Sequence, residues 1–133
     1  MLDTWRSCNG AGVESSSGRC DYRLMEVLRV EELAAVHLEL AGESDSGRSA
    51  TTLYTRPGAR LRQTLIALDA GQILGEHQSP GDASLMCLQG DVVLRAGDAE
   101  VELRAGDLVA VPPQRHDVHA RTASVLLLSV ALH

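Results

Sequence analysis

The chain has 133 residues, a mass of 14.2 kDa and a formal net charge of −6, from 12 basic and 18 acidic residues. This length fits one domain, and the apolar share of 44% excludes a fully disordered chain. The acidic balance argues against a nucleic acid or an anionic membrane surface as a partner. No apolar run approaches the roughly 20 residues of a membrane helix, and no secretory leader is visible, so we expect a cytoplasmic protein.

The residue types point to an aliphatic core. All 12 basic residues are arginine, and the chain has no phenylalanine, one tryptophan and two tyrosines. A lysine-free sequence rich in alanine, glycine and valine is typical of bacteria with GC-rich genomes. The three cysteines are too few for a disulfide framework.

The first 24 residues differ in composition from the rest, and we expect a tail of uncertain order. They are rich in serine, glycine, cysteine and arginine, as flexible segments are. Residues 25–47 are predicted to form a helix and a loop. Apolar residues fall near one face from Val27 to Ala41, with His37 on that face as a packed histidine. Gly42 stands in the usual position for ending a helix.

Residues 48–133 change to a period of two, which is typical of β-strands. Short apolar runs alternate with turns that contain glycine, and the unit Leu-Arg-Ala-Gly-Asp occurs at 94–98 and at 103–107. Many short strands with regular turns indicate a mainly β protein, a sandwich or small barrel, preceded by one α-helix. The predicted strands are 49–54, 62–68, 72–77, 84–89, 92–95, 99–104, 108–112 and an interrupted run over 116–131.

Two spaced motifs lie within this region. The first begins at Gly71, has His77 after five further residues, and ends at Gly90, with six residues between Ala83 and Gly90. The second begins at Gly106 and, after five further residues, reaches a proline; the apolar stretch 108–111 leads into it.

The two motifs resemble those of the cupin superfamily, Gly-x5-His-x-His-x3-4-Glu-x6-Gly and Gly-x5-Pro-x-Gly-x2-His. Pro112 matches the second motif, whereas His116 comes one residue early and Gln114 replaces a glycine. The resemblance covers residues 60–132 and points to small single-domain bacterial cupins, of an actinobacterial kind, with a degenerate metal motif. It implies a double-stranded β-helix, or jelly-roll, barrel over residues 48–133.

The resemblance also implies a metal centre, which this sequence holds only in part. Metal-binding cupins use two histidines and a glutamate from the first motif and a histidine from the second. Here His77 matches the first histidine, but Ser79 and Ala83 stand at the second histidine and the glutamate. With the displaced His116, two candidate metal ligands are left. We therefore expect a divalent transition metal (Zn, Fe, Mn or Ni) at low occupancy, or none.

Two further residues are candidates for a third ligand. Cys87 shares the inward parity of Ala83 and Leu85, so it is either a thiol ligand beside two imidazoles or a small core residue. Asp82 is the carboxylate nearest the missing glutamate. It lies one residue off, on the other face of the strand, unless the preceding turn bends the chain.

Three functions are compatible with these residues, and none of them names a substrate or decides whether the chain is an enzyme. The first is a small-molecule-binding cupin with an incomplete metal site, anchored by His77, Ser79 and His116. The second is a metal-dependent enzyme of the dioxygenase or isomerase type that uses the two histidines. The third is a structural or interaction module. We expect a small-molecule ligand and a homodimer. The predicted pocket lining is Ile73, Leu85, Cys87, Leu108 and Val111.

The histidines and arginines near the barrel end have alternative roles. His77 and His116 either share a pocket or are wall histidines bonded to a backbone carbonyl or to a carboxylate such as Asp117. A shared pocket predicts ligand binding that depends on pH between about 6 and 7.5. His119 is expected on the exterior, and Arg115 is the arginine best placed to orient an anionic ligand.

Overall fold

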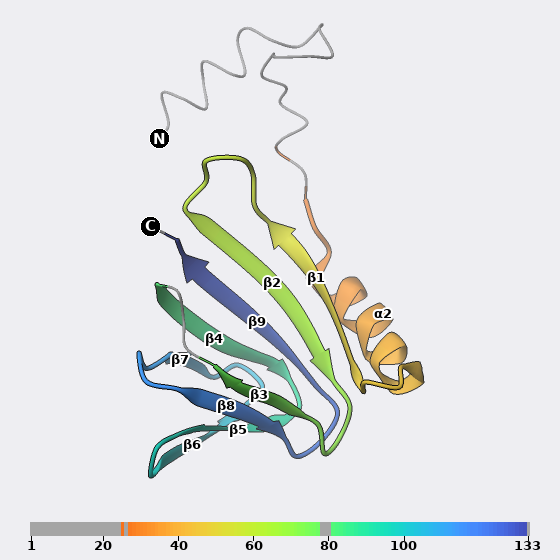
Figure 1. Ribbon diagram of the computed structural model, residues 1–133. Coiled ribbons are helices and arrows are strands. Elements are labelled where there is room, and N and C mark those ends of the chain that lie inside the picture. The colour runs from red at the N-terminus through yellow and green to blue at the C-terminus, as the bar shows by residue number, and fades with distance from the viewer. Residues whose placement is uncertain (1–24, 26, 78–80, 133) are drawn as a thin grey trace, which may run out of the picture.

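The computed structural model describes residue 25, residues 27–77 and residues 81–132. Within this part of the chain, the helix α2 (Val30–Glu43) precedes nine strands (Figure 1). No described helix has the length and apolar character needed to cross a membrane. The tail predicted over residues 1–24 lies outside the described residues. The strands are β1 (Arg48–Tyr54), β2 (Leu61–Leu68), β3 (Ile73–His77), β4 (Asp82–Gln89), β5 (Asp91–Ala96), β6 (Ala99–Arg104), β7 (Leu108–Ala110), β8 (His116–Ala120) and β9 (Ser124–Ala131).

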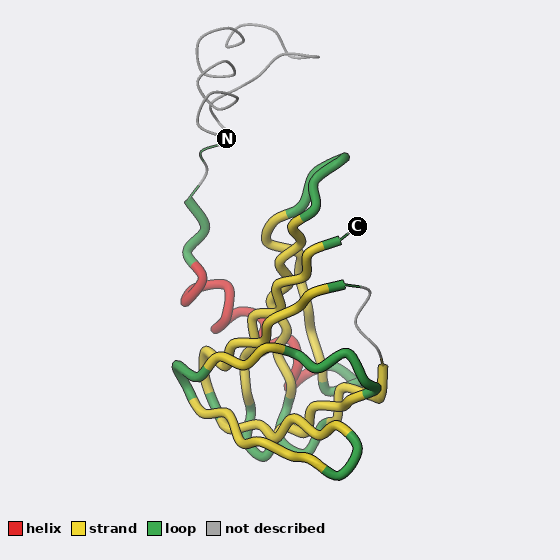
Figure 2. Tube along the Cα trace, turned by 90° about the vertical axis from the view of Figure 1, so that its left-hand side faces the viewer, coloured by secondary structure: helices red, strands yellow, loops and turns green. Residues whose placement is uncertain are grey.

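The strands form two antiparallel sheets, in the orders β1-β2-β9-β4-β7 and β3-β8-β5-β6. Their inner faces share one aliphatic core, contributed by both sheets. Figure 2 shows the strands closing around this core, with α2 outside it. Every predicted strand region contains a strand, and the interrupted run over 116–131 is β8 and β9 separated by a turn. The prediction of a mainly β barrel preceded by one helix is confirmed.

The helix α2 covers the outer face of the larger sheet. Its buried residues Ala34 and Ala41 pack with Leu65 of β2 and Val125 of β9 in a second apolar cluster. Strands β2 and β9 are therefore buried on both faces, since their alternate residues, such as Leu126, point into the barrel core. This explains the continuous apolar runs at residues 65–68 of β2 and 125–128 of β9.

The predicted helix limits need correction. The helix begins at Val30, and Val27 is 67% exposed, so a longer helix would bury nothing there. Gly42 lies inside the helix without a positive φ, and the helix ends at Glu43, followed by the C-cap Ser44, whose N–H donates to the Ala41 carbonyl. The packed role of His37 is confirmed, because its half-buried ring bonds through Nδ1 to Ser49 Oγ of β1 at 2.6 Å.

Candidate functional site

The core residues are slightly more exposed at one end of the barrel than at the other. Along β5, the inward residues Val92, Leu94 and Ala96 are 0%, 3% and 8% exposed. The inward face of β4 changes in the same direction, from fully buried Cys87 to half-buried Ala83. We call the two ends the closed end and the open end. Around the open end lie Ala83, Ala96, Val111 and His116.

His116 places an imidazole at the open end. It is the first residue of β8 and only 3% exposed, on the same face of the strand as Val118 in the core. Its Nδ1 lies 2.8 Å from the backbone carbonyl oxygen of Gln114. A carbonyl oxygen only accepts, so Nδ1 carries a hydrogen, and in the neutral ring Nε2 is the acceptor. The bond holds the ring orientation, as the wall-histidine alternative also expected.

The backbone of His77 lies directly opposite His116 in the β3–β8 pairing. A bulge between Leu74 and His77 makes this possible. Without it, strict alternation from inward Leu74 would put position 77 opposite an outward position of β8. The side chain of His77, and all of Ser79, lie outside what the structure describes. The two predicted histidine positions are thus brought together at the level of the backbone.

Cys87 lies at the closed end, near the last residue of β4, where its N–H donates to the Asp107 carbonyl and its own carbonyl accepts from the Gly106 N–H. Its Sγ donates to the carbonyl oxygens of Gln89 at 3.3 Å and Gly90 at 3.6 Å. Burial raises the pKa of this thiol, and the negative charges of Asp107 and Asp91 raise it further. A protonated thiol bonded to backbone favours the core role of Cys87 over the ligand role.

The predicted pocket lining needs two corrections. Ile73 is 40% exposed and Leu108 is 65% exposed, so neither faces the core. Leu74 and Val109 pack against the core in their place, together with Val111, which was predicted to face inward. The bulge in β3 causes the first error. The second follows from parity, because Leu108 and Val111 of one extended segment cannot share a face. The inward prediction for Leu85 and Cys87 is confirmed.

The described side chains do not fit the four-ligand cupin metal centre. Ala83, at the glutamate position, has no donor atom, and Asp82 is exposed on the other face of β4. No three histidine, cysteine or acidic side chains gather in the part of the chain that the structure describes. Among the predicted ligands whose side chains are described, only His116 presents a donor at the open end.

The remaining polar candidates lie on the outside. His119 is half-buried on the outward face of β8, beside Asp117, as expected for an exterior histidine. Asp117 accepts two hydrogen bonds from Arg95, from Nε at 3.0 Å and from Nη2 at 3.1 Å. Its carboxylate is therefore paired with Arg95. Arg115 is exposed and adjoins His116 in sequence. Sequence reasoning missed Ala96, a small residue whose only signal was its parity with Val92 and Leu94.

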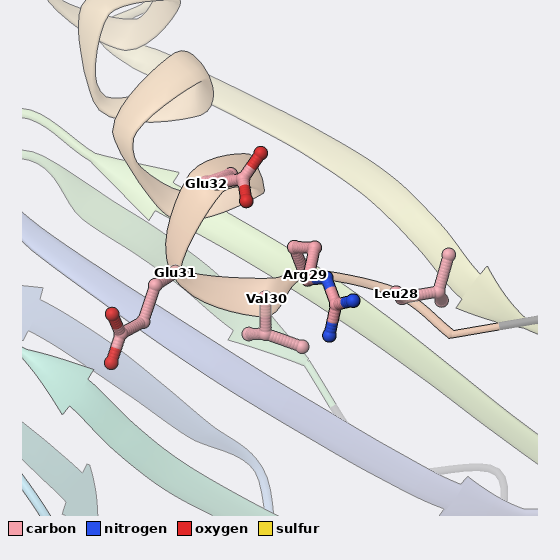
Figure 3. A pocket seen from close by; sticks show the side chains of 5 residues that line it. All are labelled: Leu28, Arg29, Val30, Glu31 and Glu32. Atoms are coloured by element: carbon pink, nitrogen blue, oxygen red, sulfur yellow. The ribbon is translucent and has the colours of Figure 1, made fainter.

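Two surface hollows lie along α2, away from the barrel interior. One, of about 360 Å³, is lined by residues 28–32, whose side chains point in different directions (Figure 3). The other, of about 510 Å³, lies between the start of α2 and the end of β4. No set of polar groups converges in the first hollow, and neither hollow is lined by a predicted site residue, so we take the open end of the barrel as the candidate ligand site.

A helix leading into a small two-sheet antiparallel barrel, with two histidine positions paired at its open end, defines a cupin-type protein. The family model described as "Cupin domain" matches residues 64–131, and the chain belongs to this family.

Solved structures agree with the family assignment. A conserved Streptococcus pyogenes protein of unknown function is 28% identical, with a TM-score of 0.60, over 68% of this chain and 78% of that one. A cupin superfamily protein from Desulfitobacterium hafniense (21%, TM-score 0.60, 65% and 78% covered) has the same fold. So does a cupin-2 domain protein from Shewanella frigidimarina (12%, TM-score 0.62, 82% and 98% covered). No curated protein matches the chain.

Proposed function

We propose that this cupin binds a small molecule at the open end of its barrel, through the His116 imidazole and without needing a metal ion. The observation that carries the proposal is a buried imidazole, held by the Gln114 carbonyl, at the end where the core becomes more exposed. The small side chains of Ala83 and Ala96 lie at the same end of the barrel. Few polar groups in apolar surroundings are the usual composition of a ligand site.

The surroundings limit the chemistry of the ligand. An imidazole offers both hydrogen-bond donor and acceptor capacity, so a small polar group on the ligand suits it. The neighbouring walls are aliphatic, from Val111 and Leu85, and suit a compact apolar body. Arg115 at the rim would orient an anionic group. We place this function in the cytoplasm, as the sequence predicts.

The alternative is a metal-dependent enzyme built on His77 and His116. The register that pairs their backbones favours it. Two protein ligands hold a divalent ion weakly, however, and Ala83 gives no third donor where the family has glutamate. We therefore rank metal-independent binding first.

A thermal-shift screen of a metabolite library in EDTA tests the proposal. We expect at least one compound to raise the melting temperature of the wild type, and the shift to be lost in His116→Ala. His119→Ala is the matched control, since it removes an imidazole from the outer face of the same strand. Shifts that appear only with added metal would favour the enzyme. A shift that survives His116→Ala would place the site elsewhere.

A further inference from the structure

The inner face of the larger sheet carries an arginine near the start of β2. Ile66 and Leu68 of this strand belong to the barrel core. Side chains alternate along a strand, so Arg62 and Thr64 share the same inner face. The register between β2 and β9 has no bulge and pairs Arg62 with Val130, which is 8% exposed. Arg62 itself is exposed and Thr64 is half-buried.

The β9 residue opposite Arg62 ties this position to the open end of the barrel. Val130 also pairs with Ala83 of β4, one of the residues around the open end. Arg62, Val130 and Ala83 therefore form one row across the inner face. In the next row toward the closed end, Thr64 lies opposite Leu128, which packs against the core. Arg62 and Thr64 thus belong to the wall that faces the smaller sheet and its imidazole at the open end.

Three hydrogen-bonding side chains gather on this wall. Thr52 of β1 lies directly opposite Thr64, so both side chains share a face, with Cβ atoms about 5 Å apart. Arg62 stands two residues before Thr64, about 7 Å along the strand. Within the described part of the chain, none of these three side chains forms a hydrogen bond or an ion pair. The guanidinium and both hydroxyls are therefore available to a ligand.

The charge of this wall selects the charge of the ligand. Arg62 is the charged member of its row, beside Val130 and Ala83. One guanidinium balances one negative charge, and its planar fork matches a carboxylate with two parallel N–H donors. The net charge of −6 disfavours a ligand with several negative charges. Arg115 is placed at the rim by its position in the sequence, whereas strand register places Arg62 on the inner wall.

We propose that Arg62, with Thr64 and Thr52, binds the carboxylate of a small monoanionic ligand. The inference rests on the proposed function, since the body of the ligand extends from this wall toward His116. The guanidinium donates two hydrogen bonds to the carboxylate, and each hydroxyl can donate one more. Because packed sheets lie about 10 Å apart, a body of a few carbon atoms bridges the two walls. The ligand class is therefore a short monocarboxylate with a polar group at its other end.

Isothermal titration calorimetry of the full chain tests this assignment. The probes are ω-hydroxy carboxylates of increasing chain length, each beside the amide of the same length. At least one carboxylate should bind the wild type, and its amide should bind at least about 10-fold more weakly, because a charge-assisted hydrogen bond is lost. Arg62→Gln should weaken the carboxylate by about 10- to 100-fold and leave the amide unchanged. Arg56→Gln is the matched control, since it removes the charge of another exposed arginine.

A second pair of variants tests the hydroxyl contribution. Thr64→Val keeps the shape of the side chain and should weaken the same carboxylate several-fold. Thr51→Val should not, because Thr51 lies opposite Leu65 on the face that α2 covers. Added salt should weaken the carboxylate and leave the amide unchanged, since it screens the exposed guanidinium. Circular dichroism melting shows that each variant is folded.

Failure of this assignment and failure of the proposed function give different results. Equal affinities for carboxylate and amide, both lost in His116→Ala, would keep binding at the open end and overturn the role of Arg62. A carboxylate preference that survives Arg62→Gln but is lost in Arg115→Gln would assign the anion to the rim and overturn it as well. If no carboxylate binds, the ligand class is wrong, and the metabolite screen still decides the proposed function.

Discussion

The turn between β4 and β5 depends on a glycine for two separate reasons, so Gly90→Ala should be strongly destabilising. Gly90 has φ of +92°, where a side chain is strained, and an added Cβ would lie 2.2 Å from Ser124 Oγ and 2.6 Å from the Ala123 carbonyl oxygen. The fully buried Ser124 cannot easily move, because its hydroxyl bonds the Asp91 N–H and the Thr122 carbonyl.

The chain offers a matched control for this substitution. Gly106 has nearly the same φ, +94°, but open space where a Cβ would lie. Gly106→Ala should therefore cost only the strained backbone, about 1–2 kcal/mol. Gly90→Ala adds overpacking of about 1–3 kcal/mol, for a total of about 2–5 kcal/mol. At about 4 °C per kcal/mol for a domain of roughly 100 residues, melting falls by about 4–8 °C for Gly106→Ala and about 8–20 °C for Gly90→Ala.

Urea unfolding of the two variants, followed by circular dichroism, measures the difference. The clash with Ser124 predicts that Gly90→Ala has the lower free energy of unfolding by at least about 1 kcal/mol. Equal losses in the two variants would show that the close approach at Ser124 does not constrain the turn, and would refute the reasoning.

Three further predictions concern stability and reactivity. Leu126→Ala, at a fully buried core position of β9, should cost about 2–5 kcal/mol in urea unfolding, and more than Leu127→Ala beside it, which is half-buried; equal costs would contradict the inward parity. The raised pKa of the Cys87 thiol means that its contribution to stability is complete below the ordinary value of 9.0 and is lost as pH rises above it. Native protein should leave Cys87 unalkylated by iodoacetamide at pH 8, as peptide mass mapping would show, and fast labelling would disprove its burial. The hydrogen bond from Arg121 lowers the pKa of Glu102, so the contribution of this pair to stability is present above pH 4.5 and is lost on acidification. Between pH 3 and 6, the free energy of unfolding should therefore fall less steeply with acid in Arg121→Ala than in the wild type. The same fall in both proteins would exclude the contact.

The sequence predicted the strands wherever turns containing glycine separated stretches of alternating apolar residues. It predicted every strand region, because each turn glycine with positive φ, such as Gly71 and Gly97, stands between two apolar runs. The helix start was wrong because apolar Val27 continues the pattern without a sheet beneath it. Burial from tertiary packing decides such limits, and local pattern cannot report it.

The candidate site was predicted less completely than the fold. Spacing identified His77 and His116, and the register now pairs their backbones. Which neighbours face inward depended on the bulge after Leu74, and an inserted strand residue leaves no mark in a period of two. Ile73 was therefore assigned to the wrong face. The thiol of Cys87 was placed on the correct face of β4. That it lies at the closed end of the barrel, however, follows only from how all the strands assemble.

The most direct test of metal-independent binding is metal content. Plasma mass spectrometry would be applied to tag-free wild type, His77→Ala and His116→Ala after incubation with zinc, iron, manganese or nickel and removal of unbound ions. His116 is the one predicted ligand whose described side chain faces inward at the open end, which predicts well under one equivalent in the wild type and no difference among the three proteins. Near one equivalent in the wild type, lost in both variants, would contradict metal-independent binding and identify a two-histidine metal centre.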